Sequence, residues 1–222
     1  MTEPSLPLYE AMSTLRAVRR LREDPIPDDV LRRILQAATW APSGGNLQPW
    51  RLVVVREAEL KRELGVLYKP LWERYAAGHR KGLEGLEGEA LAKQERMLAA
   101  ADHLGNNLGL APVILVACFN PKLMAITDAE LDRPSVVGGG SVYPALQNLM
   151  LACVNEGVGC TMTTLLCYAE EEVRALLEIP GGWYTCGFIP LGYPVGKGHG
   201  PISRRPIEKM CFGDRFGDPL QP

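Results

Sequence analysis

Apolar side chains gather into short runs along the chain, and four of these runs predict strands of a buried sheet. Residues 51–55 are rich in valine, and residues 111–119 are apolar throughout. Runs of this kind are typical of strands that are covered on both faces. Residues 158–165 predict a short strand that ends in hydroxyl side chains, and residues 183–194 predict a further strand.

Helical patterns occupy much of the chain between these runs. Helices are predicted at residues 8–15, 28–39, 57–67, 141–156 and 169–178. The second of them places its apolar side chains on one helix face, at Leu31, Ile34, Leu35 and Ala38. The fourth is apolar nearly all round, from Ala145 to Val154. A helix of that kind lies either at the centre of a core or in an interface between subunits.

Residues 69–105 differ from the rest of the chain in composition. Glutamate, lysine, arginine and glycine alternate there with scattered apolar residues, and Gly82, Gly85 and Gly88 interrupt the helical spacing. One interpretation is a helical hairpin on the surface. The other is a mobile lid over a ligand cleft, because such lids are drawn from weakly packed segments. The composition favours neither interpretation over the other.

Length and charge limit the classes of protein to which the chain can belong. A length of 222 residues suits one domain, spanning residues 1–222, with a sizeable core. The formal net charge of −2 gives no general attraction to nucleic acid or to anionic membranes. The N-terminal residues show no signal-peptide pattern, and no window approaches ~18 consecutive apolar residues. We therefore expect a cytoplasmic protein with no nucleic-acid or membrane partner.

Cysteine and histidine offer no pattern typical of a metal site. The six cysteines form no C-x-x-C pair, and the three histidines are scattered along the chain. Cysteines inside apolar runs, such as Cys118 and Cys153, are interpreted as small buried side chains in a reducing compartment. No bound metal ion is expected.

The stretch at residues 41–50 is too polar and too rich in turn-forming residues to be a packing element. Its two prolines restrict the backbone at either end, and its two glycines permit dihedral angles that other residues avoid. Ser43, Asn46 and Gln48 can then be turned toward one planar ligand. The alternative is a helix C-cap that is followed by a glycine-rich connector.

Arginines gather at two places in the chain. The first group lies just before the helix predicted at residues 28–39 and contains Arg16, Arg19, Arg20 and Arg22. The second group, Arg204 and Arg205, lies near the C-terminal end. Arginine clusters usually form solvated faces. Guanidinium groups also bind phosphate in a bidentate, charge-assisted way, so the two groups together would suit a dianionic phosphate.

The stretch Ala-Pro-Ser-Gly-Gly-Asn-Leu-Gln-Pro-Trp at residues 41–50 resembles the signature loop of the FMN-dependent nitroreductase superfamily. The superfamily includes nitroreductases, flavin reductases and iodotyrosine dehalogenases. The arginine segment, the threonine-rich segment at residues 161–165, the Leu-Gly-Tyr-Pro sequence and the Arg-Arg-Pro sequence also resemble family positions. The resemblance covers about residues 8 to 212. It implies an α+β, nitroreductase-like fold, with a mixed, mostly antiparallel central sheet flanked by helices.

The resemblance also implies a homodimer with FMN sites that are shared between its subunits. The residues that match cofactor-binding positions of the family are Arg16, Ala17, Arg19, Arg20, Pro42, Ser43, Gly44, Asn46, Gln48, Thr161, Met162, Thr163, Arg204 and Arg205. The loop at residues 42–48 would bond the rim of the flavin ring from the partner subunit. Residues 69–105 would carry the helices that recognise the substrate.

Individual roles follow from the same resemblance. Arg19 or Arg20 would stabilise the negative charge that develops at N1 and the C2 carbonyl of a reduced flavin. Thr163 would be a partner for flavin N5, and no side chain need act as a nucleophile. The chain departs from the family motif at Leu15, where arginine is common, and at Ala17, where serine is common. Arg16 is the natural substitute for the missing phosphate contact.

The function implied is a ping-pong oxidoreductase. NADH or NADPH would reduce FMN and leave, and a small organic acceptor such as a nitroaromatic or a quinone would take the electrons in the same site. Three alternatives remain open. The protein could store flavin without efficient turnover, it could be a flavin-fragmenting member of the superfamily, or a Thr163 contact to N5 could favour one-electron, dehalogenase-like reduction. Fold analogy does not choose among them.

Overall fold

The computed structural model of this chain describes residues 6–220. A four-stranded sheet in the order β1–β2–β4–β3 forms its centre, and every described strand pair is antiparallel. The strands are β1 (Trp50–Val55), β2 (Val113–Phe119), β3 (Gly159–Cys160) and β4 (Tyr184–Gly192). The structure therefore contains a strand in each of the four runs where the apolar pattern predicts one.

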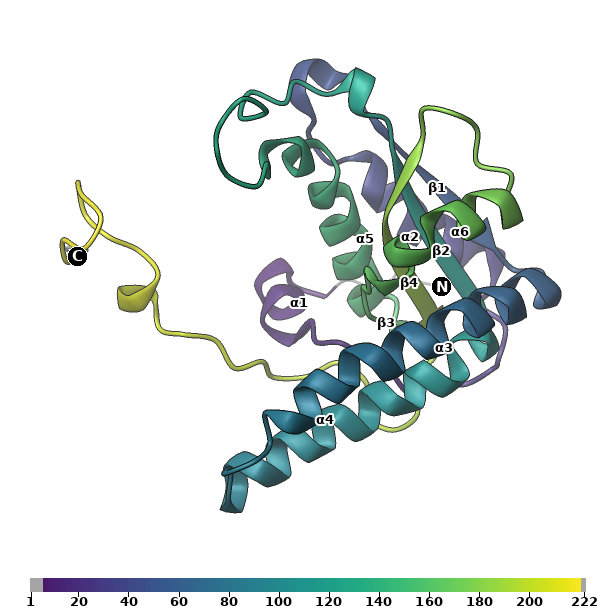
Figure 1. The fold of residues 1–222 in the computed structure, drawn as a ribbon, viewed down its shortest axis with the longest axis horizontal. Coiled ribbons are helices and arrows are strands. Elements are labelled where there is room, and N and C mark those ends of the chain that lie inside the picture. Colours follow the sequence, from purple (N-terminus) through teal and green to yellow (C-terminus); the bar gives the residue numbers. More distant parts are fainter. Residues whose placement is uncertain (1–5, 221–222) are drawn as a thin grey trace.

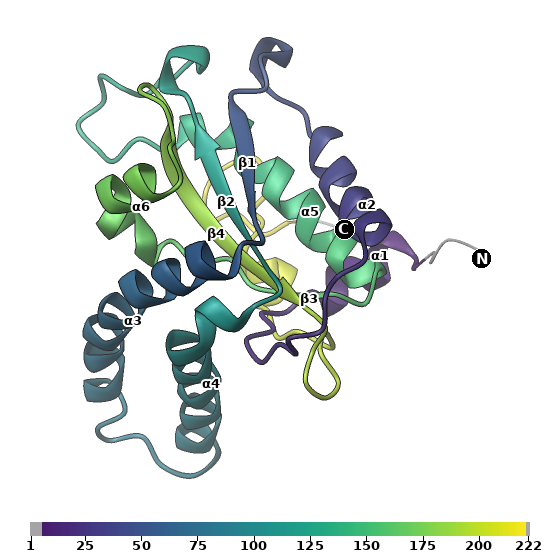
Figure 2. The ribbon, with the colours of Figure 1, turned by 90° about the vertical axis from the view of Figure 1, so that its right-hand side faces the viewer.

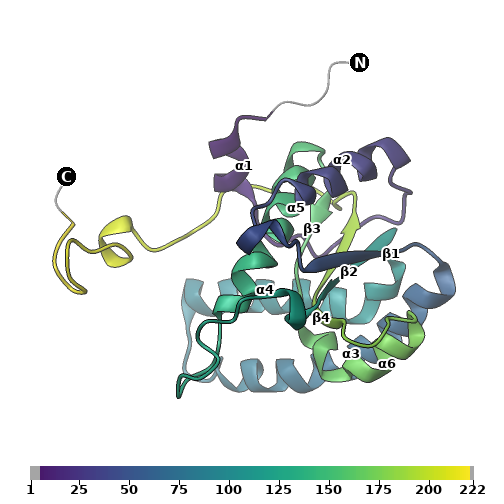
Figure 3. The ribbon, with the colours of Figure 1, turned by 90° about the horizontal axis from the view of Figure 1, so that it is seen from above.

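Helices cover both faces of this sheet. They are α1 (Leu8–Thr14), α2 (Asp28–Thr39), α3 (Ala58–Lys81), α4 (Gly88–Asn107), α5 (Tyr143–Asn155) and α6 (Glu170–Leu176). Figures 1 and 2 show α2 and α5 on one side of the sheet and α3, α4 and α6 on the other. The view from above separates the same layers, with the strands between them (Figure 3). This is the expected α+β arrangement.

Strand β2 is apolar throughout because both faces of the sheet are covered at this strand. Its alternate side chains Ile114, Val116 and Cys118 belong to the core under α3 and α4. The intervening side chains Val113, Leu115 and Ala117 belong to the core under α2 and α5. Because successive side chains of a strand point to opposite faces, a strand between two helix layers must be apolar at every position.

The strand predicted at residues 158–165 is shorter than expected. Only Gly159 and Cys160 form β3, and the chain then leaves the β-ladder. It returns to β4 at Thr163, which exchanges two backbone hydrogen bonds of 2.9 Å with Phe188. The prediction is thus wrong for most of residues 161–165. The chain turns there into a short 3₁₀ helix that buries Leu165 and Leu166 in the core.

The helix predicted at residues 57–67 is also much longer than expected, because α3 continues through Pro70 as far as Lys81. Its inner face explains the continuation: Leu64, Tyr68, Trp72 and Ala76 recur every four residues and are buried. Proline removes one backbone donor, and burial of this face outweighs that loss. α3 and α4 form the α3–α4 hairpin, whose base packs on the sheet and whose tip extends away from it (Figure 2).

The two helices of the hairpin approach closely at Gly105. A methyl group at this position would lie 2.2 Å from Trp72 Cδ1, which is far inside van der Waals contact. We expect Gly105→Ala to lower the free energy of unfolding by about 1–3 kcal/mol, since a well-packed core resists added volume. Chemical denaturation measures this loss.

A matched control lies on the other helix of the hairpin. Gly78 has no atom within 4 Å of an added methyl group. Gly78→Ala should therefore leave stability unchanged or raise it by up to about 1 kcal/mol, because alanine favours the helix. Equal stability of Gly105→Ala and the wild-type protein would contradict the close packing of Trp72.

Residues 201–220 leave the body of the molecule as an extended arm (Figure 1). Its large apolar side chains are exposed at Ile207, Met210 and Phe216. Within residues 6–220, no helix combines the length and the apolar character that crossing a membrane requires.

Candidate functional site

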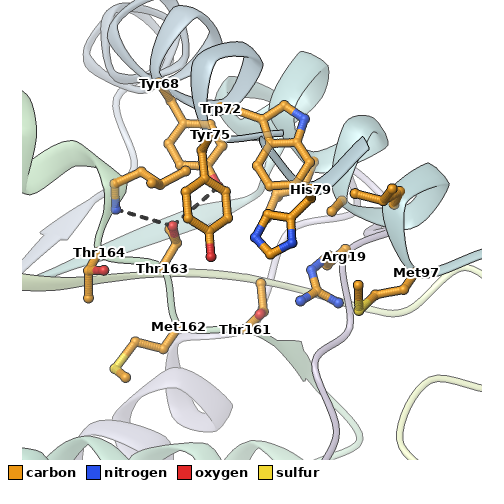
Figure 4. Close-up of a pocket in the computed structure, with 14 residues that line it drawn as sticks. Arg19, Tyr68, Trp72, Tyr75, His79, Met97, Thr161, Met162, Thr163 and Thr164 are labelled. Atoms are coloured by element: carbon orange, nitrogen blue, oxygen red, sulfur yellow. Dashed lines mark hydrogen bonds between the residues drawn. The ribbon is translucent and has the colours of Figure 1, made fainter. Parts of the chain in front are cut away.

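A pocket of about 400 Å³ opens between the α3–α4 hairpin and the segment at residues 161–165. Rings, hydroxyl groups, one arginine and apolar side chains line it (Figure 4). Rings from α3 form one wall, the hydroxyl side chains of Thr161, Thr163 and Thr164 face them, and Arg19 closes an end. The remaining lining is apolar and comes mainly from α4.

The wall of rings comes from one face of α3. Tyr68, Trp72, Tyr75 and His79 follow each other at spacings of four, three and four residues, which places them on the same side of a helix. The ring centroids of Trp72 and Tyr75 are 5.9 Å apart, and those of Tyr75 and His79 are 4.6 Å apart. Trp72 is held in place because its Nε1 donates to Asp102 Oδ1 at 2.9 Å.

This wall is not among the features predicted from the sequence. The signal was present as the helical spacing of four ring-bearing residues in positions 68–79. It was obscured by the expectation that a helix would end near residue 67. Residues 69–105 form most of the α3–α4 hairpin, in agreement with the hairpin interpretation, and movement of the hairpin as a lid stays a prediction.

Arg19 is a half-buried cation that forms no hydrogen bond or ion pair with another residue of the described chain 6–220. Burial lowers the pKa of its guanidinium, an effect that the nearby Tyr68 partly opposes. Burying a charge without a partner is costly. Because Arg19 faces a pocket, an electron-rich ligand group in that pocket would remove the cost.

Backbone hydrogen bonds fix the arginine segment beside residues 161–165. Val18 N donates to Cys160 O at 2.9 Å, and Arg22 N donates to Tyr193 O at 2.8 Å. His199 lies against the same segment, with Nδ1 3.1 Å from Arg16 O and Nε2 2.9 Å from Val158 O. Burial opposes its charged form, but hydrogen bonds to these carbonyls and to Cys160 raise the pKa of His199 overall.

The other predicted arginines of the first group do not line the pocket. Arg16 Nε donates to Gly198 O at 2.8 Å, and Arg20 Nη2 lies 3.4 Å from Ala99 O. Both side chains are exposed, as is that of Ala17. Of the two arginines expected beside the flavin ring, the structure thus places Arg19 in the pocket and Arg20 outside it.

Thr161, Met162 and Thr163, three of the predicted site residues, all line the pocket. The backbone N–H and carbonyl of Thr163 are both engaged with Phe188. Its side-chain Oγ1 lies 3.2 Å from Tyr68 Oη and 3.4 Å from the backbone nitrogen of Leu165 (Figure 4). Its hydroxyl is therefore the group that Thr163 can direct toward a ligand.

The loop that contains Pro42, Ser43, Gly44, Asn46 and Gln48 is closed by its own hydrogen bonds. Gln48 N donates to Ser43 Oγ at 2.9 Å, and Gln48 Nε2 lies 3.1 Å from both oxygens of Asn46. Asn46 and Gln48 have positive φ angles of 54° and 48°, which are unusual for residues with side chains. The loop is well formed but does not line the pocket of its own chain.

Arg204 and Arg205 lie on the extended arm. Arg204 Nη1 donates to the carbonyl of Ser203 at 2.9 Å, and both arginine side chains are exposed. The structure therefore does not bring them to Arg19 within one chain. Among residues 6–220, no three His, Cys, Asp or Glu side chains are grouped as metal ligands would be.

Comparison with known proteins assigns the chain to a family. Residues 14–193 match the model of the nitroreductase family. The chain belongs to the nitroreductase family. A relative, named NADH dehydrogenase, from Thermus thermophilus is 30% identical over 229 residues, covering 95% of this chain and 98% of the relative. The predicted family and fold class are both confirmed.

Two further proteins are similar to this chain. The iodotyrosine deiodinase of Nematostella vectensis is 25% identical over 211 residues, covering 95% of this chain and 76% of the relative. A nitroreductase with bound FMN from Desulfitobacterium hafniense has a TM-score of 0.64 at 21% identity, covering 96% of this chain and all of that chain, 100%. The structural likeness shows the common fold, and the roles of individual residues stay predictions.

Proposed function

We propose that this nitroreductase-family protein is an FMN-dependent oxidoreductase that uses NADH or NADPH to reduce a small organic acceptor. The observation that carries the proposal is the half-buried Arg19, which no other described residue pairs with, in a pocket that also presents the hydroxyl of Thr163. The nitroreductase with bound FMN and the relative named NADH dehydrogenase support it.

The residues of the pocket fit a flavin ring. A planar ring with carbonyl and nitrogen acceptors suits a wall of rings, a row of hydroxyl groups and a guanidinium without a partner among residues 6–220. FMN supplies the redox chemistry when it is bound. Arg19 would stabilise negative charge at the pyrimidine end, and Thr161 and Thr163 would bond the ring edge. Trp72 and Tyr75 would shield the site from water and contact the acceptor.

We also propose that a second copy of the chain completes the site. The loop at residues 42–48 and the pair Arg204 and Arg205 match family positions but do not reach the pocket of their own chain. The extended arm with its exposed apolar side chains supports a dimer in which the arm of one subunit contacts the other. Arg16, Arg204 and Arg205 would then hold the FMN phosphate.

Anaerobic reduction of the FMN-loaded protein tests the function. We expect NADH or NADPH to bleach the flavin absorbance, and a nitroaromatic or a quinone to restore it. Failure of both dinucleotides to bleach a protein that binds FMN would favour flavin storage and contradict the proposal. Consumption of reduced flavin in air, with a benzimidazole product, would identify a flavin-fragmenting enzyme instead.

A reductive dehalogenase is the second candidate. The Thr163 hydroxyl in the pocket favours it, together with the relatives that are named iodotyrosine deiodinase. A halophenol added as the acceptor in the same anaerobic assay separates the two functions. Release of halide at a rate well above that of nitroaromatic or quinone reduction would favour dehalogenation.

A further inference from the structure

We propose that Tyr68 is a positioning residue for the Thr163 hydroxyl, and that the two hydroxyl groups form a hydrogen-bond chain whose direction can reverse. The inference rests on the proposed function, because the partner at the pocket end of the chain would be N5 of bound FMN. It deepens that function by assigning a role to a buried side chain of the α3–α4 hairpin.

The backbone of Thr163 is already committed elsewhere. Its N–H donates to Phe188 O at 2.9 Å, and its carbonyl accepts from Phe188 N at 2.9 Å. These two bonds fasten the residue to β4 and leave no backbone donor for a ligand. Any polar contact that Thr163 makes in the pocket must therefore come from its hydroxyl.

The surroundings of that hydroxyl restrict where its proton can go. Tyr68 Oη lies 3.2 Å from Thr163 Oγ1, and either oxygen can be the donor. Leu165 N also points at Oγ1, from 3.4 Å, and can only donate. When Tyr68 donates as well, both lone pairs of Oγ1 are engaged, so the Thr163 proton is free to point into the pocket.

Tyr68 is well placed to act through Thr163. Its side chain is only 3% exposed and belongs to the core under α3 and α4, which holds the phenol in one position. Burial raises the pKa of Tyr68, although its bond to Thr163 and the nearby Arg19 partly oppose the rise. The phenol therefore stays protonated at neutral pH and can either donate or accept a hydrogen bond.

The chain can then match both redox states of a flavin. Oxidised N5 accepts a hydrogen bond, so Tyr68 donates to Thr163 and Thr163 donates to the ring. Reduced N5 carries a hydrogen and donates. Thr163 then accepts from N5, and its own proton turns toward Tyr68 Oη. Reversal needs only two hydroxyl rotations, and Tyr68 and Thr163 stay hydrogen-bonded to each other in both directions.

Redox titration of the FMN-loaded variants tests this inference. Tyr68→Phe keeps the ring but leaves the Thr163 proton without an acceptor when the flavin is reduced. We expect the affinity for reduced FMN to fall about fivefold relative to that for oxidised FMN, with a matching decrease in midpoint potential. Tyr168→Phe, which alters an exposed tyrosine outside the pocket, should titrate like the wild-type protein.

A double-mutant cycle separates positioning from a direct effect. Because Tyr68 acts through Thr163, the variant Tyr68→Phe/Thr163→Val should show the same midpoint potential as Thr163→Val alone. Thr163→Ser, which keeps the hydroxyl, should remain close to the wild-type protein. Additive shifts in the double variant would overturn the inference, as would an unchanged potential in Tyr68→Phe.

Failure of the proposed function and failure of this inference give different results. If the wild-type protein does not bind FMN, the proposed function and this inference both fail. If it binds FMN and is reduced by NADH or NADPH, but Tyr68→Phe titrates like the wild-type protein, only the inference fails.

Discussion

Replacing Arg19 with alanine is expected to lower kcat/KM for dinucleotide-dependent reduction of an acceptor by roughly a hundredfold. Arg19 is the only arginine or lysine among the pocket-lining residues described here, and no other described residue pairs with it. Negative charge that develops on a reduced flavin would lose its fixed cation in this variant. Steady-state kinetics with NADH and with NADPH measure the loss, and the midpoint potential of bound FMN should decrease as well.

Arg22→Ala is the matched control for this prediction. Arg22 lies three residues further along the same segment, is exposed, and pairs with Asp24 at 3.3 Å. It does not line the pocket, so its removal should change kcat/KM less than about twofold, as is usual for exposed ion pairs. Equal losses in Arg19→Ala and Arg22→Ala would show a general effect of positive charge and contradict a specific role for Arg19.

Trp72→Ala is expected to lower the free energy of unfolding by about 3–5 kcal/mol, the range typical of removing a buried aromatic side chain. Trp72 is 8% exposed, belongs to the core under α3 and α4, and also forms part of the pocket wall. Its loss would leave a cavity beside Gly105 and weaken the packing of the hairpin on the sheet. Denaturant unfolding of the FMN-free protein measures this effect.

Trp72→Phe separates the packing of the ring from its hydrogen bond. Phenylalanine retains an aromatic wall but cannot donate to Asp102, whose Oδ1 also accepts from Arg80. We expect this variant to lose much less stability, about 1–2 kcal/mol. A loss as large as that of Trp72→Ala would mean that the hydrogen bond, and not the buried ring, holds the hairpin in place.

Much of the fold could be predicted from local sequence patterns, because each strand run and each short helix carries its own signal. α2 and α5 begin and end within about two residues of their predicted bounds. α3 could not be predicted in full, since Pro70 disfavours the interior of a helix locally. The burial of Tyr68 and Trp72 against distant strands decides its length, and that information is not local.

The candidate site also contains residues that local motifs predict and residues that they do not. Arg19, Thr161, Met162 and Thr163 could be found because they lie in short motifs, and the structure places all four in one pocket. The wall of rings on α3 was missed although its helical spacing is present in the sequence, because recognising it required the correct length of that helix. The loop at residues 42–48 and Arg204 match family motifs but lie outside the pocket of their own chain. Their roles in binding a cofactor therefore stay predictions.

Titration of the purified, flavin-free protein with FMN measures whether the pocket binds a flavin. We expect saturable quenching of flavin fluorescence, with one FMN bound per chain and a Kd in the micromolar range or below. A protein that stays colourless and leaves FMN fluorescence unchanged at micromolar concentrations would contradict it.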